Sequence, residues 1–176
     1  MNPLTESMVK CPPDCPPMKL LLVSPSHKRG KLIKLPKALK IPQLTLHILA
    51  SLTPNDVDIT VVDEEIREID FSSDFDLVGI SCMTATANRS YQLSDMYRQR
   101  GSKVVLGGIH PSILPQEAIQ HADAVVIGEA EGCWPDVIND FRKGNLQKFY
   151  RVPVPIFQSV LSQGEISKLT RRYLTV

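Results

Sequence analysis

The sequence contains no long run of apolar residues. No segment reaches the roughly 18 apolar residues of a transmembrane helix, and the N-terminus lacks the contiguous apolar region of a signal peptide. We therefore expect a cytoplasmic protein with no membrane partner. The formal net charge is only +1, so no overall field attracts nucleic acid, and we expect no nucleic-acid partner.

Cysteine is too sparse to indicate a disulfide framework, with four in the whole chain. Cys11 and Cys15 form a Cys-x-x-x-Cys within a proline-rich segment. Because no third or fourth ligand lies nearby, a structural role is favoured over a metal site. Cys82 and Cys133 stand in apolar surroundings and are expected to be buried.

The chain does contain a regular alternation of short aliphatic runs and helical segments. The aliphatic runs predict buried strands at 19–24, 57–62, 77–80, 103–106 and 124–128. Periodicity and helix-breaking residues predict helices at 43–52, 84–100, 115–120 and 129–143. Thr84 is expected to cap the second helix, and Gly101 to end it.

This alternation, without any hairpin signal, predicts an α/β protein. We expect a doubly wound, parallel five-stranded sheet in a Rossmann-like or flavodoxin-like three-layer sandwich with right-handed crossovers. A small sixth strand or edge segment is expected near Phe149. Residues 1–18 hold five of the 14 prolines and are expected to be a flexible leader. The domain then covers 19–151, and 152–176 is expected to be a linker toward another domain.

The usual signatures of nucleotide binding and hydrolysis are missing from this pattern. Neither Gly-x-Gly-x-x-Gly nor a phosphate-binding loop follows the first strand, so Asp63 alone does not indicate NAD. A phosphoacceptor site would need paired acids after that strand, where the chain has Ser24-Pro25-Ser26-His27. The Gly-x-Ser-x-Gly of many hydrolases is also absent.

Ligands of open α/β sheets bind beyond the carboxyl ends of the strands. Small residues follow the strand at 77–80, where Ser81, Thr84 and Ala85 leave room for a large group. Gly107 and Gly108 follow the next strand, and two glycines permit positive φ and close approach of a ligand. We therefore expect the ligand at this edge.

Several residues on the expected ligand side allow two interpretations. His27 and His110 stand at strand ends, and each is either a structural histidine or a metal ligand. Glu129 and Glu131 form either an acid/base pair or, as we favour, negative charges at the first turn of a helix. Trp134 either stacks on a ligand or, as we favour, packs in the core.

The order of the strand-end segments resembles a known family. Ser81-Cys82-Met83, Gly107-Gly108 and Gly128-Glu129-Ala130-Glu131 resemble the cobalamin-binding domain that precedes the core of radical S-adenosylmethionine enzymes. Segments 42–54 and 62–64 are also similar, and the resemblance spans roughly 19–151. It implies a Rossmann-like sheet that holds cobalamin across its carboxyl edge. S-adenosylmethionine and an iron-sulfur cluster would belong to a core domain absent from this chain.

Two departures from the family patterns qualify these roles. Related domains with a cobalt-ligating histidine carry Asp-x-His-x-x-Gly, whereas this chain has Pro25-Ser26-His27-Lys28-Arg29-Gly30. Proline replaces the aspartate that would orient the ring. The resemblance implies that a lower cobalt ligand is commonly lacking in the radical family, so we treat His27 as a pocket residue and, secondarily, as a candidate cobalt ligand. The signature Cys-x-x-x-Cys-x-x-Cys does not occur. We therefore expect no catalysis by the chain alone, its parent being a radical S-adenosylmethionine enzyme such as a methyltransferase.

The leading interpretation is a module that binds a corrinoid and works with a radical S-adenosylmethionine core in cis or in trans. One alternative is a degenerate docking module that uses the basic segment 28–40 and the C-terminal tail; another is a flavodoxin-like protein that binds a nucleotide or flavin. The candidate cofactor-binding residues, taken mainly from the strand ends and from the resemblance, are Ser24, Pro25, Ser26, His27, Pro42, Asp63, Glu64, Ser81, Met83, Thr84, Ala85, Gly107, Gly108, His110, Gly128 and Glu129.

Overall fold

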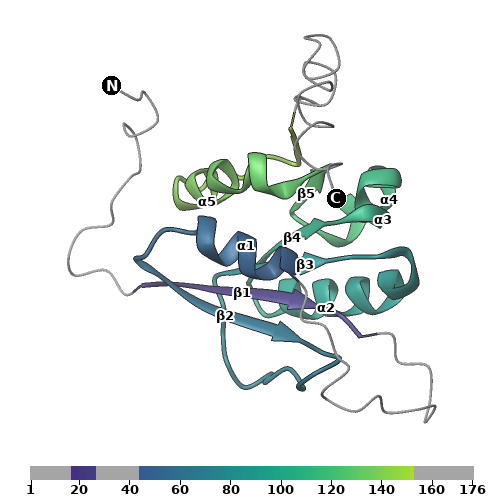
Figure 1. Ribbon diagram of the computed structural model, residues 1–176, viewed down its shortest axis with the longest axis horizontal. Helices are drawn as coiled ribbons and strands as arrows, with labels where there is room; N and C mark the ends of the chain where they lie inside the picture. Colours follow the sequence, from purple (N-terminus) through teal and green to yellow (C-terminus); the bar gives the residue numbers. More distant parts are fainter. Residues whose placement is uncertain (1–16, 27–43, 153–176) are drawn as a thin grey trace, which may run out of the picture.

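The computed structural model describes residues 17–26 and 44–152, which form a parallel sheet flanked by helices (Figure 1). The strands are β1 Met18–Ser24, β2 Val57–Asp63, β3 Leu77–Ser81, β4 Lys103–Gly107, β5 Ala124–Ile127 and β6 Phe149–Arg151. The helices are α1 Leu44–Leu52, α2 Ala87–Gln99, α3 Ile109–Ile113, α4 Pro115–His121 and α5 Trp134–Arg142, with short 3₁₀ turns η3 Thr84–Thr86 and η4 Ala130–Gly132.

The strand order is β2-β1-β3-β4-β5-β6, and all neighbouring pairs are parallel. The chain runs outward from β1 to β2 and then returns to the other side of β1 to form β3. This reversal is the topological switch point of a doubly wound sheet. The predicted α/β class is confirmed, and the segment near Phe149 forms a sixth strand beside β5.

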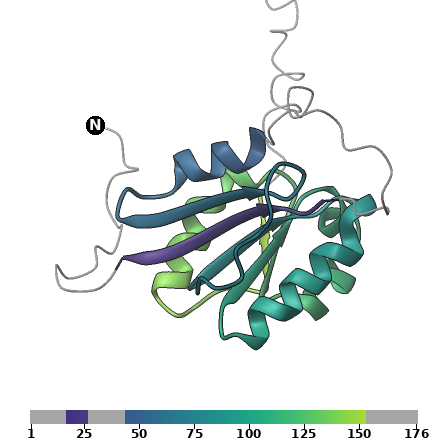
Figure 2. The same cartoon turned by 90° about the horizontal axis from the view of Figure 1, so that it is seen from below.

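The two faces of the sheet bury different side chains of the same strand. In β1, Leu20 and Leu22 pack in the cluster that includes α1 and α5, whereas Leu21 and Val23 pack in the cluster that includes α2 and α4. Figure 2 shows α1 and α2 on opposite sides of the sheet. A strand covered on both faces needs apolar residues at every position, which explains the unbroken aliphatic runs of the sequence.

Helix α2 ends as predicted but begins later than predicted. Gly101 has a φ of 93°, and the N–H of Ser102 donates to the carbonyl of Tyr97 at 3.1 Å, which is a Schellman motif. At the other end, the expected cap at Thr84 is wrong. A 3₁₀ turn precedes the helix, so the Thr86 hydroxyl instead accepts the N–H of Met83 at 3.2 Å.

Helix α5 also begins later than the sequence suggested, at Trp134 rather than Glu129. Pro135 stands in its first turn, where the missing N–H costs no hydrogen bond. Glu131 lies in the preceding 3₁₀ turn, and Asp136 is the acidic residue of the first helical turn. The short helix α3 was not predicted at all. In the described part of the chain, no helix has the length and apolar character needed to cross a membrane.

Candidate functional site

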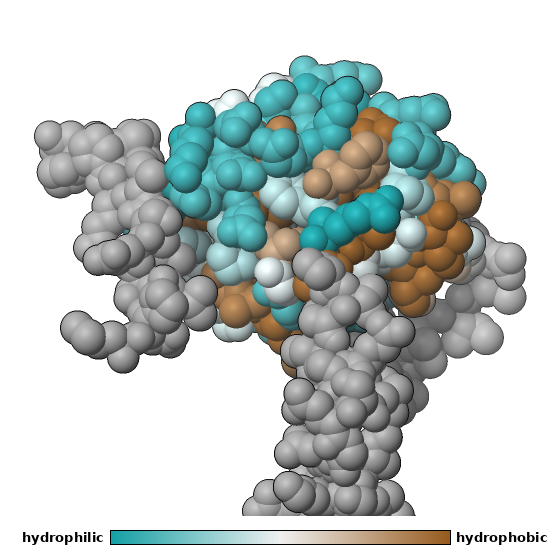
Figure 3. Space-filling view, turned by 90° about the horizontal axis from the view of Figure 1, so that it is seen from above, coloured by the Kyte–Doolittle hydropathy of each residue, from teal (hydrophilic) through white to brown (hydrophobic). Residues whose placement is uncertain are grey.

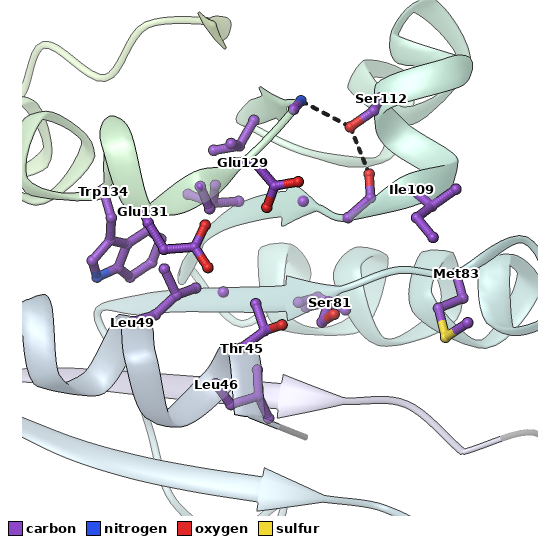
Figure 4. A pocket seen from close by; sticks show the side chains of 18 of the residues that line it. Thr45, Leu46, Leu49, Ser81, Met83, Ile109, Ser112, Glu129, Glu131 and Trp134 are labelled. Carbon is purple, nitrogen blue, oxygen red and sulfur yellow. Dashed lines mark hydrogen bonds between the residues drawn. The ribbon is translucent and has the colours of Figure 1, made fainter. Parts of the chain in front are cut away.

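A cavity of about 520 Å³ opens at the carboxyl ends of β3, β4 and β5, on the face of the sheet that α1 and α5 cover (Figure 4). This volume falls within the roughly 300–1,000 Å³ that is usual for ligand pockets. The lining residues come from α1, from the three strand ends and from the segments that follow them: Thr45, Leu46, Leu49, Gly79, Ile80, Ser81, Met83, Val105, Gly107, Gly108, Ile109, Ser112, Ile113, Val126, Gly128, Glu129, Ala130, Glu131 and Trp134.

Two glycines form part of the cavity floor. A Cβ at Gly79 would lie 2.9 Å from the Leu22 side chain and 3.2 Å from the indole of Trp134. Glycine therefore lets the indole lie directly against β3. At Gly107, an added Cβ would have only the Cβ of Val126 within 4 Å, at 3.7 Å. A side chain there would project into free space, so the depth of the cavity depends on this glycine.

Trp134 forms one end of the cavity and also belongs to the core. Its ring is 1% exposed, so the prediction of core packing is confirmed. The indole N–H donates to the Thr53 hydroxyl at 2.9 Å, and that hydroxyl donates to the carbonyl of Leu49 at 2.8 Å. These bonds fix α5 against the end of α1. The aromatic wall is therefore held in place by the fold itself.

The opposite wall is formed by α3 and the turn after β5. The Ser112 hydroxyl donates to the carbonyl of Gly108 at 2.7 Å and accepts the N–H of Gly128 at 2.9 Å (Figure 4). Gly108 has a φ of 103°, and a Cβ there would lie 2.7 Å from the carbonyl oxygen of Cys82. Glycine at this position is thus required by the backbone of the protein, and the positive φ that the sequence predicted is confirmed here. The close approach of a ligand at Gly108 stays a prediction.

The rim of the cavity carries apolar side chains that nothing in the described chain covers. Met83, Ile109 and Ile113 are 49%, 61% and 67% exposed, although all three line the cavity. Seen from above, an apolar patch lies on the right, the side on which Figure 1 places α3 (Figure 3). Exposed apolar surface beside a cavity is typical of a site for a large, partly apolar ligand.

The structure brings six of the predicted residues to the cavity: Ser81, Met83, Gly107, Gly108, Gly128 and Glu129. Eight others do not line it: Ser24, Pro25, Ser26, Asp63, Glu64, Thr84, Ala85 and His110. His27 and Pro42 lie outside the described residues. Two residues of this second set, Glu64 and His110, have partners within the fold.

Glu64 ties the end of β1 to α2. Its carboxylate accepts the backbone N–H of Ser26 at 3.0 Å and forms two hydrogen bonds with Arg89, at 2.6 and 3.2 Å. The Glu64 side chain is only 5% exposed, and its hydrogen bond raises the pKa of the Arg89 guanidinium. The backbone N–H of Glu64 donates to the carbonyl of Ser24 at 3.0 Å. The Glu64 carboxylate therefore forms hydrogen bonds that stabilise the fold.

His110 lies on the far side of α3 from the cavity. It is 6% exposed, and its Nε2 lies 3.0 Å from the Tyr91 hydroxyl, which donates to Glu117 at 3.0 Å. Burial, together with the hydrogen bond to Glu117, raises the pKa of Tyr91. Because α3 begins at Ile109, the side chain of Ile109 lines the cavity, whereas that of His110 points toward Tyr91 on α2. Within residues 17–26 and 44–152, no group of three or more His, Cys, Asp or Glu side chains could hold a metal ion.

The prediction of the site used only the ends of strands. It therefore missed the residues that helices α1 and α3 contribute to the cavity. Leu46 and Leu49 on α1 are spaced by three, and Ile109 and Ile113 on α3 by four. Each spacing places two apolar side chains on one helical face. This signal was present in the sequence, but α3 was not recognised as a helix.

Comparison with known proteins assigns a family to these residues. The family model for the B12 binding domain matches residues 38–138. The chain is 42% identical over 108 residues to bacteriochlorophyllide d C-8(2)-methyltransferase of Chlorobaculum tepidum, which covers 61% of this chain and 24% of that protein. It is 32% identical over 136 residues to the C-12(1)-methyltransferase of the same organism, covering 76% of this chain and 29% of the relative.

An uncharacterized methyltransferase of Pyrococcus horikoshii is 29% identical over 140 residues, covering 72% of this chain and 30% of that protein. The chain therefore corresponds to less than a third of the length of each of these three relatives. No solved structure gives a significant match.

Proposed function

Because this chain belongs to the B12-binding domain family, we propose that it is the cobalamin-binding module of a cobalamin-dependent radical S-adenosylmethionine enzyme. The module would span 19–151 and hold a corrinoid at the carboxyl edge of the sheet. The module would work with a radical S-adenosylmethionine core domain in cis or in trans. The observation that best supports this proposal is the cavity of about 520 Å³ at the ends of β3, β4 and β5.

The residues that line the cavity, and its volume, are compatible with a corrinoid. Cobalamin is broad, largely uncharged at its rim, and carries a nucleotide tail. An apolar slot of this volume takes one aromatic group of such a ligand, while the exposed Ile109 and Ile113 offer a surface for the macrocycle. Leu49 and Trp134 would pack against the inserted group. The hydroxyl of Ser81 is available for hydrogen bonding.

The bound corrinoid would supply cobalt chemistry, and the names of the relatives indicate methyl transfer as the reaction of the parent enzyme. S-adenosylmethionine and an iron-sulfur cluster would be held by the core domain. Within this module, the described residues would bind and orient the corrinoid. His27, which lies outside them, remains the candidate cobalt ligand.

The proposal is tested by mixing the purified protein with hydroxocobalamin and following the corrinoid spectrum through gel filtration. We expect the spectrum to elute with the protein. The variant Thr45→Trp places an indole at the cavity mouth from an exposed position of α1 and should weaken retention by at least tenfold. The matched control His47→Trp, exposed on the same helix but outside the cavity, should bind normally.

A colourless protein peak with the unaltered chain would contradict the proposal. Retention of flavin mononucleotide in place of hydroxocobalamin would favour the flavodoxin-like alternative. Equal binding by the Thr45→Trp and unaltered proteins would show that the corrinoid lies elsewhere.

A further inference from the structure

We infer that Glu129 and Glu131 make this site selective for corrinoids whose peripheral side chains are amides, and against corrinoids that carry free carboxylates. The inference rests on the proposed function and adds the specificity of the same site. It follows from the charge of the cavity lining, from the free acceptor atoms of these two residues, and from their position relative to α5.

In the described part of the chain, the ionisable side chains that line the cavity have charge of one sign. Among the described residues that line it, Glu129 and Glu131 are the only ones with ionisable side chains, and no lysine, arginine or histidine accompanies them. Both carboxylates extend from the segment after β5 toward the interior of the cavity (Figure 4). The other polar groups of the lining are hydroxyls, such as those of Thr45 and Ser81.

The two carboxylates keep their acceptor capacity. Within residues 17–26 and 44–152, neither Glu129 nor Glu131 takes part in a side-chain hydrogen bond or an ion pair. The contrast with other glutamates is clear, because Glu64 is paired with Arg89 and Glu117 accepts the Tyr91 hydroxyl. Carboxylates held beside a cavity without an internal partner are suited to accept hydrogen bonds from a ligand.

The helix dipole does not account for these charges. Helix α5 begins at Trp134, and the acidic residue in its first turn is Asp136. Glu129 and Glu131 precede the helix, in and before a 3₁₀ turn.

The chemistry of the corrinoid periphery gives these charges a role. A primary amide is neutral, and its N–H groups donate to a carboxylate in a charge-assisted hydrogen bond. A free carboxylate offers no donor and would bring a like charge toward Glu129 and Glu131. Glu129 is exposed and Glu131 is half-buried, so water screens part of this repulsion, and the half-buried Glu131 contributes the larger share of the discrimination. Amidated corrinoids are therefore favoured over carboxylated ones.

The test compares hydroxocobalamin with its three monocarboxylic acids, in which one propionamide of the ring is hydrolysed and the nucleotide tail is unchanged. Dissociation constants are measured for the unaltered protein and for the double variant Glu129→Gln/Glu131→Gln. The matched control is Glu68→Gln, an exposed glutamate that does not line the cavity. Circular dichroism confirms that each variant is folded.

We expect at least one monocarboxylic acid to bind the unaltered protein about tenfold more weakly than hydroxocobalamin. The double variant should reduce this difference to about twofold, because the neutral glutamines remove the repulsion, and the control should preserve it. Two results would overturn this inference and leave the proposed function standing. One is equal binding of all four ligands by the unaltered protein, and the other is a tenfold difference that persists in the double variant. Failure of the unaltered protein to bind hydroxocobalamin would instead refute the proposed function and, with it, this inference.

Discussion

The adjacent glycines Gly107 and Gly108 should respond in opposite ways to the same added methyl group. At Gly108, alanine would have to adopt a φ of 103° and would place its Cβ 2.7 Å from the carbonyl oxygen of Cys82. That oxygen accepts the N–H of His110 at 3.2 Å. Backbone strain of roughly 1–3 kcal/mol, with about 1 kcal/mol for a weakened hydrogen bond, gives a loss of roughly 2–4 kcal/mol in the free energy of unfolding.

At Gly107, the same substitution meets almost no resistance. The new Cβ would lie 3.7 Å from that of Val126, an ordinary contact, and no positive φ is required. Alanine in a strand is favoured over glycine by roughly 0.5–1 kcal/mol, so stability should be unchanged or slightly higher. Because the methyl group projects into the cavity, retention of hydroxocobalamin should nevertheless fall.

Urea unfolding followed by circular dichroism measures both free energies, and gel filtration with hydroxocobalamin measures binding. We expect Gly108→Ala to be the less stable variant and Gly107→Ala to be a stable protein with weakened binding. If Gly108→Ala unfolds at the same urea concentration as the unaltered protein, the contact between the Gly108 position and Cys82 is wrong. If Gly107→Ala binds as well as the unaltered protein, Gly107 does not face the ligand.

Two further substitutions probe the aromatic residues. Trp134→Phe removes the hydrogen bond to Thr53 and part of a buried ring, and should lower the free energy of unfolding by about 1.5–3 kcal/mol in urea titrations; an unchanged value would contradict the buried placement of the indole. Since Trp134 is the only tryptophan in the sequence, hydroxocobalamin should also quench the intrinsic tryptophan fluorescence of the unaltered protein. The Tyr97 hydroxyl is buried without a hydrogen-bond partner among the described residues, so Tyr97→Phe should be about 1 kcal/mol more stable at pH 7. Burial raises the pKa of Tyr97 to about 12, above its ordinary value near 10, so the folded state keeps a proton that the unfolded state loses, and stability should decline between pH 10 and pH 12. The phenylalanine variant should show a shallower decline in urea titrations across this range, and identical slopes would refute the assignment.

The layered architecture could be predicted because its signals are local. A strand buried on both faces must be apolar throughout, and runs such as Leu20–Val23 and Leu77–Ile80 satisfy this requirement without reference to distant residues. Gly101 likewise predicts the end of a helix from local sequence, because the positive φ that it adopts is required by the end of α2 and by no distant residue. The family resemblance also drew on short segments in a fixed order.

The candidate site was predicted less completely because its geometry depends on contacts between distant segments. The partner of Glu64 is Arg89 on α2, and the sequence does not show that the two meet. The direction in which His110 points depends on the residue at which α3 begins. In the same way, α5 begins at Trp134 and not at the predicted Glu129, so Glu131 does not lie in its first turn.

The double hydrogen bond of Ser112 has a consequence for how a ligand is received. Its hydroxyl joins the carbonyl of Gly108 to the N–H of Gly128, so the segments that leave β4 and β5 are joined in one arrangement. Two independent loops would each lose conformational freedom when they close on a ligand, at a cost that lowers affinity. Here the fold has already restricted both loops before any ligand arrives. This wall of the cavity is preorganised, and we expect Ser112→Ala to lower affinity through the conformational freedom that it returns to the two loops.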